Sequence, residues 1–162
     1  KEGQIVGIDV GSIYEDYYGD HAKTFAVSSI DEDKKELINV TRECLYKAID
    51  EVQVGNNIGD IGYVIQNHAE KYGFGVVREL VGHGIGKKLH EEPQVPNFGI
   101  KGQGALIEPG MCLAIEPMIN MGTYEVYTKK DQWTICTKDG KPSAHFEHSI
   151  AVTEKGVRIL TK

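Results

Sequence analysis

Residues 82–99 read GHGIGKKLHEEPQVPNFG, and this stretch decides more about the fold and the chemistry than any other part of the chain. Glycines on both sides of His83 let the backbone and a ligand approach each other closely, so we expect a glycine-spaced loop at Gly82–Gly86. His90 follows seven residues later. Two histidines this close suggest one metal ligand and one side chain that hydrogen-bonds a substrate. For His83 in isolation, a solvent-exposed loop histidine is the simpler interpretation.

The sequence before this stretch predicts a hairpin followed by two helices. The four elements are expected at 5–13, 17–27, 31–52 and 58–71. The apolar residues of 5–13 alternate, as on one face of a strand, whereas those of 31–52 recur at helical spacing. Asn57 suits the N-cap of the second helix and Gly73 suits its end.

The sequence after it predicts mainly strands. The segment 91–110 holds three prolines and four glycines and is expected to be irregular. Strands are predicted at 111–121, 125–137 and 143–153, and the last two should form a hairpin around the turn Asp139-Gly140. Strands at both ends with helices between them favour a single α+β domain over 1–162. In such a domain the helices pack on one face of a curved, mainly antiparallel sheet.

Asp9 and Asp20 fall in the two strands of the first hairpin. If its loop is the two residues Tyr14-Glu15, Asp9 lies directly opposite Asp20, with the Cβ atoms about 5 Å apart. A longer loop or a bulge would change this register. Like charges at this distance repel each other, and a bound cation would remove the conflict. The alternative is a pair of aspartates that face water on an edge hairpin.

Glu116 and Glu147 are carboxylates within the apolar segments LAIEPM and FEHSIAV. An unpaired buried charge is very costly, and neither segment contains a lysine or an arginine. A salt bridge to a lysine elsewhere is the alternative to a metal. Trp133, the only tryptophan, is expected within about a residue of a position opposite Phe146 and Glu147. There it would either wall an apolar pocket beside the metals or pack as an ordinary core or sheet-surface aromatic.

Five residues thus form a candidate metal site of four carboxylates and one imidazole: Asp9, Asp20, His83, Glu116 and Glu147. Such a carboxylate-rich mixture favours Mn, Fe(II) or Co, with Zn as a further candidate. If the five side chains converge, the chain carries a two-metal hydrolytic centre.

The composition limits the class of protein. A net charge of −6 argues against nucleic-acid binding, which requires a basic surface. No apolar run approaches the ~20 residues of a membrane span, and no signal peptide is visible. The number of cysteines, three, is odd, and no CxxC spacing occurs. Both observations favour a reducing compartment such as the cytoplasm.

Together these segments resemble the methionine aminopeptidases, in particular their type I branch. The resemblance is carried by Ile8-Asp9-Val10 and the Asp20 that follows, by GHGIG at 82–86, by HEEPQVPNFG at 90–99, by IEPM at 115–118 and by FEHSIAVT around Glu147. It extends over nearly the whole chain. The resemblance implies the pita-bread (creatinase/aminopeptidase) fold, in which a curved sheet with helices on its outer face cradles two divalent metals.

The resemblance also implies a role for each residue. Asp9 would bind one metal, His83 and Glu116 the other, while Asp20 and Glu147 would bridge both. His90 would contact the substrate peptide carbonyl. Trp133 and Leu89 would help to line the pocket for the methionine side chain, although the family usually carries an aromatic residue at the position of Leu89.

The resemblance further implies an activity and its setting. The protein would remove N-terminal methionine from nascent polypeptides in the cytoplasm, as a monomer, with the ribosome as a partner. Members of the family have a leading segment with a further substrate-contacting histidine, and residues 1–8 do not match it. We therefore expect a chain that holds the metals but lacks part of the substrate site. It is either an N-terminally truncated fragment of the enzyme, with its own activity left open, or a chain that shares the site with another chain. The alternatives are an X-Pro aminopeptidase and a non-catalytic binding module of the same fold.

Overall fold

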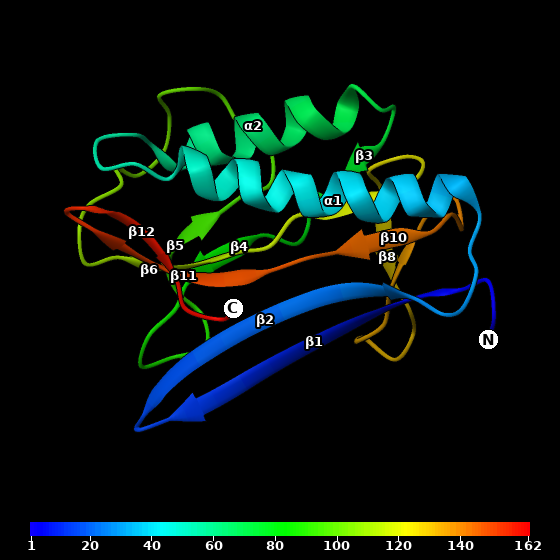
Figure 1. Cartoon of the computed structure of the whole chain (residues 1–162), viewed down its shortest axis with the longest axis horizontal. Helices are drawn as coiled ribbons and strands as arrows, with labels where there is room; N and C mark the ends of the chain where they lie inside the picture. The colour runs from blue at the N-terminus through cyan, green and yellow to red at the C-terminus, as the bar shows by residue number, and fades with distance from the viewer.

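The structure, a computed structural model, describes residues 1–162 and places two helices over one face of a bent array of strands (Figure 1). The elements run in the order β1 (Ile5–Tyr14), β2 (Tyr17–Ala26), α1 (Glu32–Glu51), α2 (Ile58–Glu70), β3 (Gly75–Val76), β4 (Gly82–Gly84), β5 (Glu91–Val95), β6 (Cys112–Ile115), β7 (Met118–Asn120), β8 (Val126–Thr128), β9 (Ile135–Thr137), β10 (Ser143–His145), β11 (His148–Thr153) and β12 (Gly156–Ile159). All strand pairs are antiparallel. The predicted α+β class, with helices packed on one face of the strands, is confirmed.

The hairpin β1–β2 turns one residue later than predicted. Its loop is Glu15-Asp16, and both residues have positive φ angles, 47° and 65°. These angles are typical of a type I′ turn. A loop at Tyr14-Glu15 would force Tyr14 into this left-handed region, which a bulky side chain avoids and an aspartate tolerates.

The register of the hairpin therefore differs from the prediction by two residues. Asp9 lies opposite Ala22, and Asp20 lies opposite Gly11, so the predicted direct pairing of Asp9 with Asp20 is wrong. A shift of two residues leaves every side chain on its original face of the strand. The two aspartates are diagonal neighbours on one face instead of direct partners.

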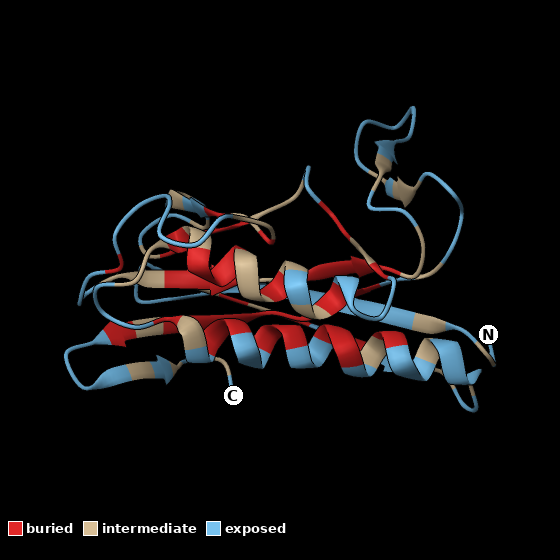
Figure 2. Ribbon diagram, turned by 90° about the horizontal axis from the view of Figure 1, so that it is seen from above, coloured by how far each residue is buried: buried red, intermediate tan, exposed pale blue.

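The two helices form where the sequence predicts them, to within a residue at each end. The side chains of α1 that repeat at helical spacing are buried against the strands, as the buried stripe in Figure 2 shows. The N-terminus of α2 is closed by Asp60, whose carboxylate accepts a 2.7 Å hydrogen bond from the backbone N–H of Asn57. Gly73 follows α2 with a φ angle of 75°. Neither helix is long and apolar enough to cross a membrane.

The prediction of a loop at Gly82–Gly86 is wrong, because the first three residues of this stretch form strand β4. This strand lies between β5 and β6 in a sheet of order β12-β11-β6-β4-β5. Side chains at Gly82 and Gly84 would collide with the backbone oxygens of Ala114 and Glu92. The glycines therefore permit close packing of neighbouring strands. The prediction of an irregular segment from 91 is also wrong for β5, which covers the first five of its residues.

The predicted strand 111–121 is broken in two at Glu116-Pro117. Proline has no N–H to donate to a ladder. Strand β6 stays in the five-stranded sheet, whereas β7 joins a second sheet of order β10-β7-β3. The predicted strand 143–153 is broken in the same way, at Phe146-Glu147, into β10 and β11.

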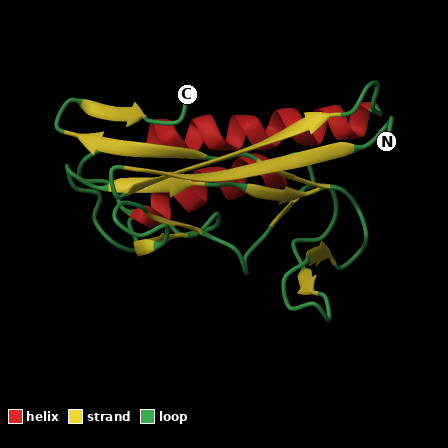
Figure 3. Cartoon of the chain, turned by 90° about the horizontal axis from the view of Figure 1, so that it is seen from below, coloured by secondary structure: helices red, strands yellow, loops and turns green.

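The predicted last hairpin is wrong in its pairing. Segment 125–137 folds back on itself as β8 and β9, while β10 pairs with β7. Asp131 explains the reversal, because its carboxylate accepts hydrogen bonds from the backbone N–H groups of Trp133 and Thr134 at 3.0 and 2.9 Å. Such local bonds compete with a long ladder. The hairpin β8–β9 projects from the body of the molecule (Figure 3), and Trp133 in its connection is not paired with Phe146.

Candidate metal centre

Glu116 and Glu147 lie at two chain breaks that face each other. His145 of β10 pairs with Met118 of β7, and His148 of β11 pairs with Ile115 of β6. The same register carried through the gap places Glu147 opposite Glu116. At the gap the backbone groups find other partners: the N–H of Glu147 donates to the carbonyl of Ala22 at 2.8 Å, and the carbonyl of Glu116 accepts from the Asn97 amide at 3.0 Å. The break thus releases both glutamates from the ladders without leaving these backbone groups unpaired.

Asp20, His83 and Glu147 are all buried and offer ligand atoms that lie within 4.8 Å of one another. His83 on β4 contacts the Gly84 carbonyl through Nδ1 at 2.9 Å. Since a carbonyl only accepts hydrogen bonds, Nδ1 carries the proton, and the lone pair is on Nε2. That nitrogen is 3.4 Å from Oε1 of Glu116, which joins the fourth predicted ligand to the group.

Asp20 is fixed through its backbone by a residue far along the chain. The backbone N–H of Asp20 donates to the Ser149 hydroxyl at 2.9 Å, and that hydroxyl donates to the Asp20 carbonyl at 2.8 Å. Asp9, on the neighbouring strand, lines the same cavity as His83 and Glu116. The five predicted ligands are thereby brought to one place, from β1, β2, β4 and the two breaks.

The electrostatics of this cluster are those of carboxylates without a cation. Burial, followed by the charges of Asp20 and Asp9, raises the pKa of Glu116 to about 8. Burial, followed by the charge of Glu116, raises the pKa of Glu147 to about 9. Burial and the charge of Asp9 likewise raise the pKa of Asp20. Burial lowers the pKa of His83, so its ring is neutral and its nitrogen is available.

One oxygen atom shows most directly that a cation fits this cluster. Oε1 of Glu147 is buried and has no hydrogen-bond partner. A buried polar atom without a partner is rare and destabilising. A divalent cation would bind this oxygen and stabilise the ionised carboxylates. The residues therefore fit one or more metal ions.

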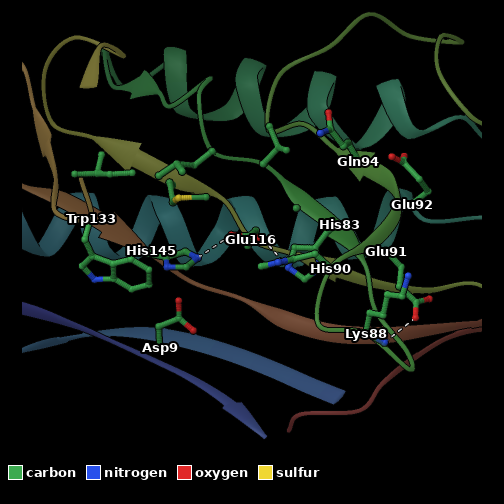
Figure 4. Close-up of a pocket in the computed structure, with 15 residues that line it drawn as sticks. Asp9, His83, Lys88, His90, Glu91, Glu92, Gln94, Glu116, Trp133 and His145 are labelled. Atoms are coloured by element: carbon green, nitrogen blue, oxygen red, sulfur yellow. Dashed lines mark hydrogen bonds and ion pairs between the residues drawn. The ribbon is translucent and has the colours of Figure 1, made fainter. Parts of the chain in front are cut away.

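A cavity of about 1100 Å³ opens beside the cluster, and Figure 4 shows the side chains that line it: Asp9, Leu80, Val81, Gly82, His83, Lys88, His90, Glu91, Glu92, Gln94, Glu116, Met118, Trp133, Ile135 and His145. The exposed His90 packs edge-on against His83, with ring centroids 4.4 Å apart. Its imidazole is thus placed between the cluster and the solvent. The volume is sufficient for a short peptide terminus.

The other two predicted substrate residues differ in their positions. Trp133 lines the cavity from the β8–β9 connection, and its side chain is 87 % exposed. Leu89 is not among the lining residues; its side chain lies instead against the hairpin, where a Cβ at Gly11 would be 3.7 Å from Leu89 Cδ1.

Among the cavity residues that the sequence did not indicate, His145 lies beside a predicted ligand. Its Nε2 atom is 3.6 Å from Oε2 of Glu116. Burial lowers the pKa of His145 to about 4, so the ring is neutral. The spacing contained a signal, since His145 and Glu147 are two residues apart and an extended chain places such residues on the same face.

Comparison with known proteins agrees with this geometry. Residues 1–154 match metallopeptidase family M24. The chain belongs to this family. The chain is 52 % identical over 161 residues to methionine aminopeptidase A of Synechocystis. The match covers 99 % of this chain and 64 % of that protein. The crystal structure of methionine aminopeptidase from Thermotoga maritima matches with a TM-score of 0.98 at 51 % identity, over 100 % of this chain and 65 % of that one.

A second group within M24 is more distant. The prolidase of Pyrococcus horikoshii matches with a TM-score of 0.80 at 26 % identity, over 100 % of this chain and 41 % of that one. The fold is thus the pita-bread fold that the sequence predicts. The chain spans 64 to 65 % of the length of the two methionine aminopeptidases named above.

Proposed function

We propose that the protein is a methionine aminopeptidase, a hydrolase that removes N-terminal methionine from nascent polypeptides. The observation that carries the proposal is the identity of about half of all positions with proteins of that name across the whole chain. The proximity of five candidate metal ligands beside a cavity supports it.

We further propose that the centre holds two divalent ions, with Co, Mn, Fe(II) or Zn as the candidates. Asp9 would bind one ion and His83 with Glu116 the other, while Asp20 and Glu147 would bridge both. The partnerless Glu147 Oε1 and the raised pKa of Glu116 support this assignment, because both are relieved by a cation. When bound, such ions lower the pKa of water and polarise a carbonyl group.

Side chains of the protein would transfer the proton, stabilise the oxyanion and bind the substrate. Glu116, whose carboxylate is at the edge of the cavity, would take the proton of the attacking water and deliver it to the leaving amine. His90 would donate a hydrogen bond to the developing oxyanion, and its ring packs against that of His83. Trp133 and Leu89 would enclose the methionine thioether. The support is stronger for Trp133, because Trp133 lines the cavity and Leu89 does not.

The first rival is an X-Pro peptidase, a reaction class represented among the more distant structural relatives. The identity of 51 % to a methionine aminopeptidase against 26 % to a prolidase favours the proposal. The test is a comparison of Met-Gly-Met and Xaa-Pro peptides with Mn²⁺ or Co²⁺ added. Faster release from Xaa-Pro, or no metal-dependent release of methionine, would refute it.

The second rival is a binding module that keeps the fold without metals. The four carboxylates and the orphaned Glu147 oxygen argue against it, since nothing else in the centre balances them. Metal analysis of purified protein after addition of Mn²⁺ separates the two. We also propose that residues 1–162 form one catalytic domain of a cytoplasmic monomer that acts on chains leaving the ribosome.

A further inference from the structure

His145 is held in place by one hydroxyl group on the hairpin β1–β2. The backbone N–H of His145 donates to the Thr24 hydroxyl at 2.9 Å, and that hydroxyl donates to the His145 carbonyl, also at 2.9 Å. The residue ends strand β10, where His145 pairs with Met118. The backbone is therefore clamped from two sides, and the direction of the side chain is fixed with it.

The imidazole that this clamp directs into the site has no partner of its own. Nε2 of His145 is buried and makes no hydrogen bond. Its nearest charged neighbour is Oε2 of Glu116, at 3.6 Å. The separation exceeds a hydrogen bond by about 0.5 Å, a gap that a small rotation of either side chain closes.

The carboxylate of Glu116 therefore lies between two imidazoles, one at each oxygen. Oε1 faces His83 and Oε2 faces His145, as the dashed lines of Figure 4 show. The two rings are not equivalent. His83 belongs to the buried group whose ligand atoms lie within 4.8 Å of one another, and His145 does not. The geometry therefore makes His83 a candidate metal ligand, and it makes His145 a neighbour of the candidate ligand Glu116.

We propose that His145 is a positioning residue of the metal centre: its Nε2–H donates to Glu116 and fixes the direction in which that carboxylate presents its other oxygen. The proposal rests on the metal centre proposed above. A carboxylate that binds a cation through one oxygen leaves the second to be satisfied, and outer hydrogen bonds of this kind orient ligands and tune the metal. Neutral imidazole can supply the bond, since one ring nitrogen always carries a proton.

Three variants at this position separate the role from a merely structural one. His145→Gln places an amide donor near Nε2, His145→Asn places one near Nδ1, and His145→Leu removes the donor. The glutamine variant should behave as wild type if a donor at Nε2 is all that is required. His68→Leu is the matched control, because His68 also lies beside a carboxylate, 2.8 Å from Glu43, on the helical surface.

The experiment is calorimetric titration of the purified protein with Co²⁺, with Glu116→Gln identifying the binding step that depends on Glu116. We expect His145→Leu and His145→Asn to weaken that step by about 10- to 100-fold. His145→Gln and His68→Leu should remain within about threefold of wild type. The visible absorption of bound Co²⁺, which reports coordination geometry, should change in the leucine and asparagine variants and be restored by glutamine.

The outcomes are decisive in both directions. Equal affinities in all variants would overturn the proposal, and so would equal losses in the glutamine and leucine variants, which would indicate a direct ligand. Circular dichroism confirms folding first, and the asparagine variant replaces the leucine variant if the latter does not fold. A wild-type protein that binds no Co²⁺ would remove the metal centre and this role together. Co²⁺ binding that depends on His145, without release of methionine, would refute only the aminopeptidase activity.

Discussion

Glu116 faces Glu147 across the gap where two antiparallel ladders break at the same point. Two carboxylates in such a position repel each other, and burial raises the pKa of both, to about 8 and about 9. The two buried carboxylates therefore destabilise the metal-free protein at the centre of the proposed active site.

The metal-free protein should lose stability as the pH rises. Glu116 and Glu147 have a pKa that is higher in the folded protein than the ordinary glutamate value of 4.5. Between these values the folded state binds more protons than the unfolded state, so each group lowers the free energy of unfolding by up to about 1.4 kcal/mol per pH unit. Thermal unfolding in the presence of a chelator, from pH 5 to pH 9, should show a falling midpoint. Glu147→Gln should flatten the decline, and a rise in stability over this range would contradict the prediction.

The number of bound ions should depend on which carboxylate is removed. Asp9→Asn should abolish one binding step for Mn²⁺ and leave the other, because Asp9 is proposed to serve one ion only. Glu147→Gln should weaken both steps, since Glu147 is proposed to bridge them. Calorimetry gives the stoichiometry, with the exposed Asp33 changed to Asn as the control. Loss of both ions in Asp9→Asn would show that the assignment is wrong.

His90→Ala should impair catalysis and spare metal binding. Loss of one oxyanion donor costs about 3 kcal/mol, which is roughly 100-fold in kcat. His90 is exposed and packs on His83 only through its ring edge, so the fold should tolerate the change. Steady-state kinetics on a Met-Gly-Met peptide and a Mn²⁺ titration test the two halves of this prediction. An unchanged kcat would remove His90 from the mechanism.

Trp133→Ala should raise KM for methionyl peptides without destabilising the protein. The side chain is 87 % exposed, so its removal should change the free energy of unfolding by no more than about 0.5 kcal/mol. The control is Tyr127→Ala, because Tyr127 is also an exposed aromatic residue and does not line the cavity. If the two variants have the same KM, Trp133 is not part of the substrate pocket.

Replacing Glu15-Asp16 by Asn-Gly should stabilise the protein by up to about 1 kcal/mol. Both positions have positive φ angles, which asparagine and glycine adopt with less strain than the native residues, and the conformational entropy of glycine offsets part of this gain. Denaturant unfolding measures the change. Destabilisation would argue against a type I′ turn and against the observed register of β1 and β2.

The candidate metal ligands can be predicted from the sequence because the arguments for them do not depend on the exact register of the strands. Asp9 and Asp20 were predicted to share a face, and a shift of two residues preserves the face even though it removes the direct pairing. Glu116 and Glu147 were singled out because their segments hold no counter-charge, which is a property of composition and needs no knowledge of pairing.

Predictions that depended on pairing between distant strands were less successful. The sequence predicts Trp133 within about a residue of a position opposite Phe146 and Glu147, because it indicates the turn at Asp139-Gly140 and does not indicate the turn that Asp131 creates. His145 was missed because its importance lies in its distance to Glu116, and these two residues meet only when β10 pairs with β7. Local propensity does not report which strands become neighbours.

The double hydrogen bond between Asp20 and Ser149 joins residues 129 positions apart. The hairpin that carries Asp9 and Asp20 is local, whereas Glu147 and Ser149 lie more than 120 positions further along the chain. The contact that joins this hairpin to β11 is therefore also the contact that brings Asp20 to Glu147. Closure of the fold and assembly of the proposed metal centre are thus a single event.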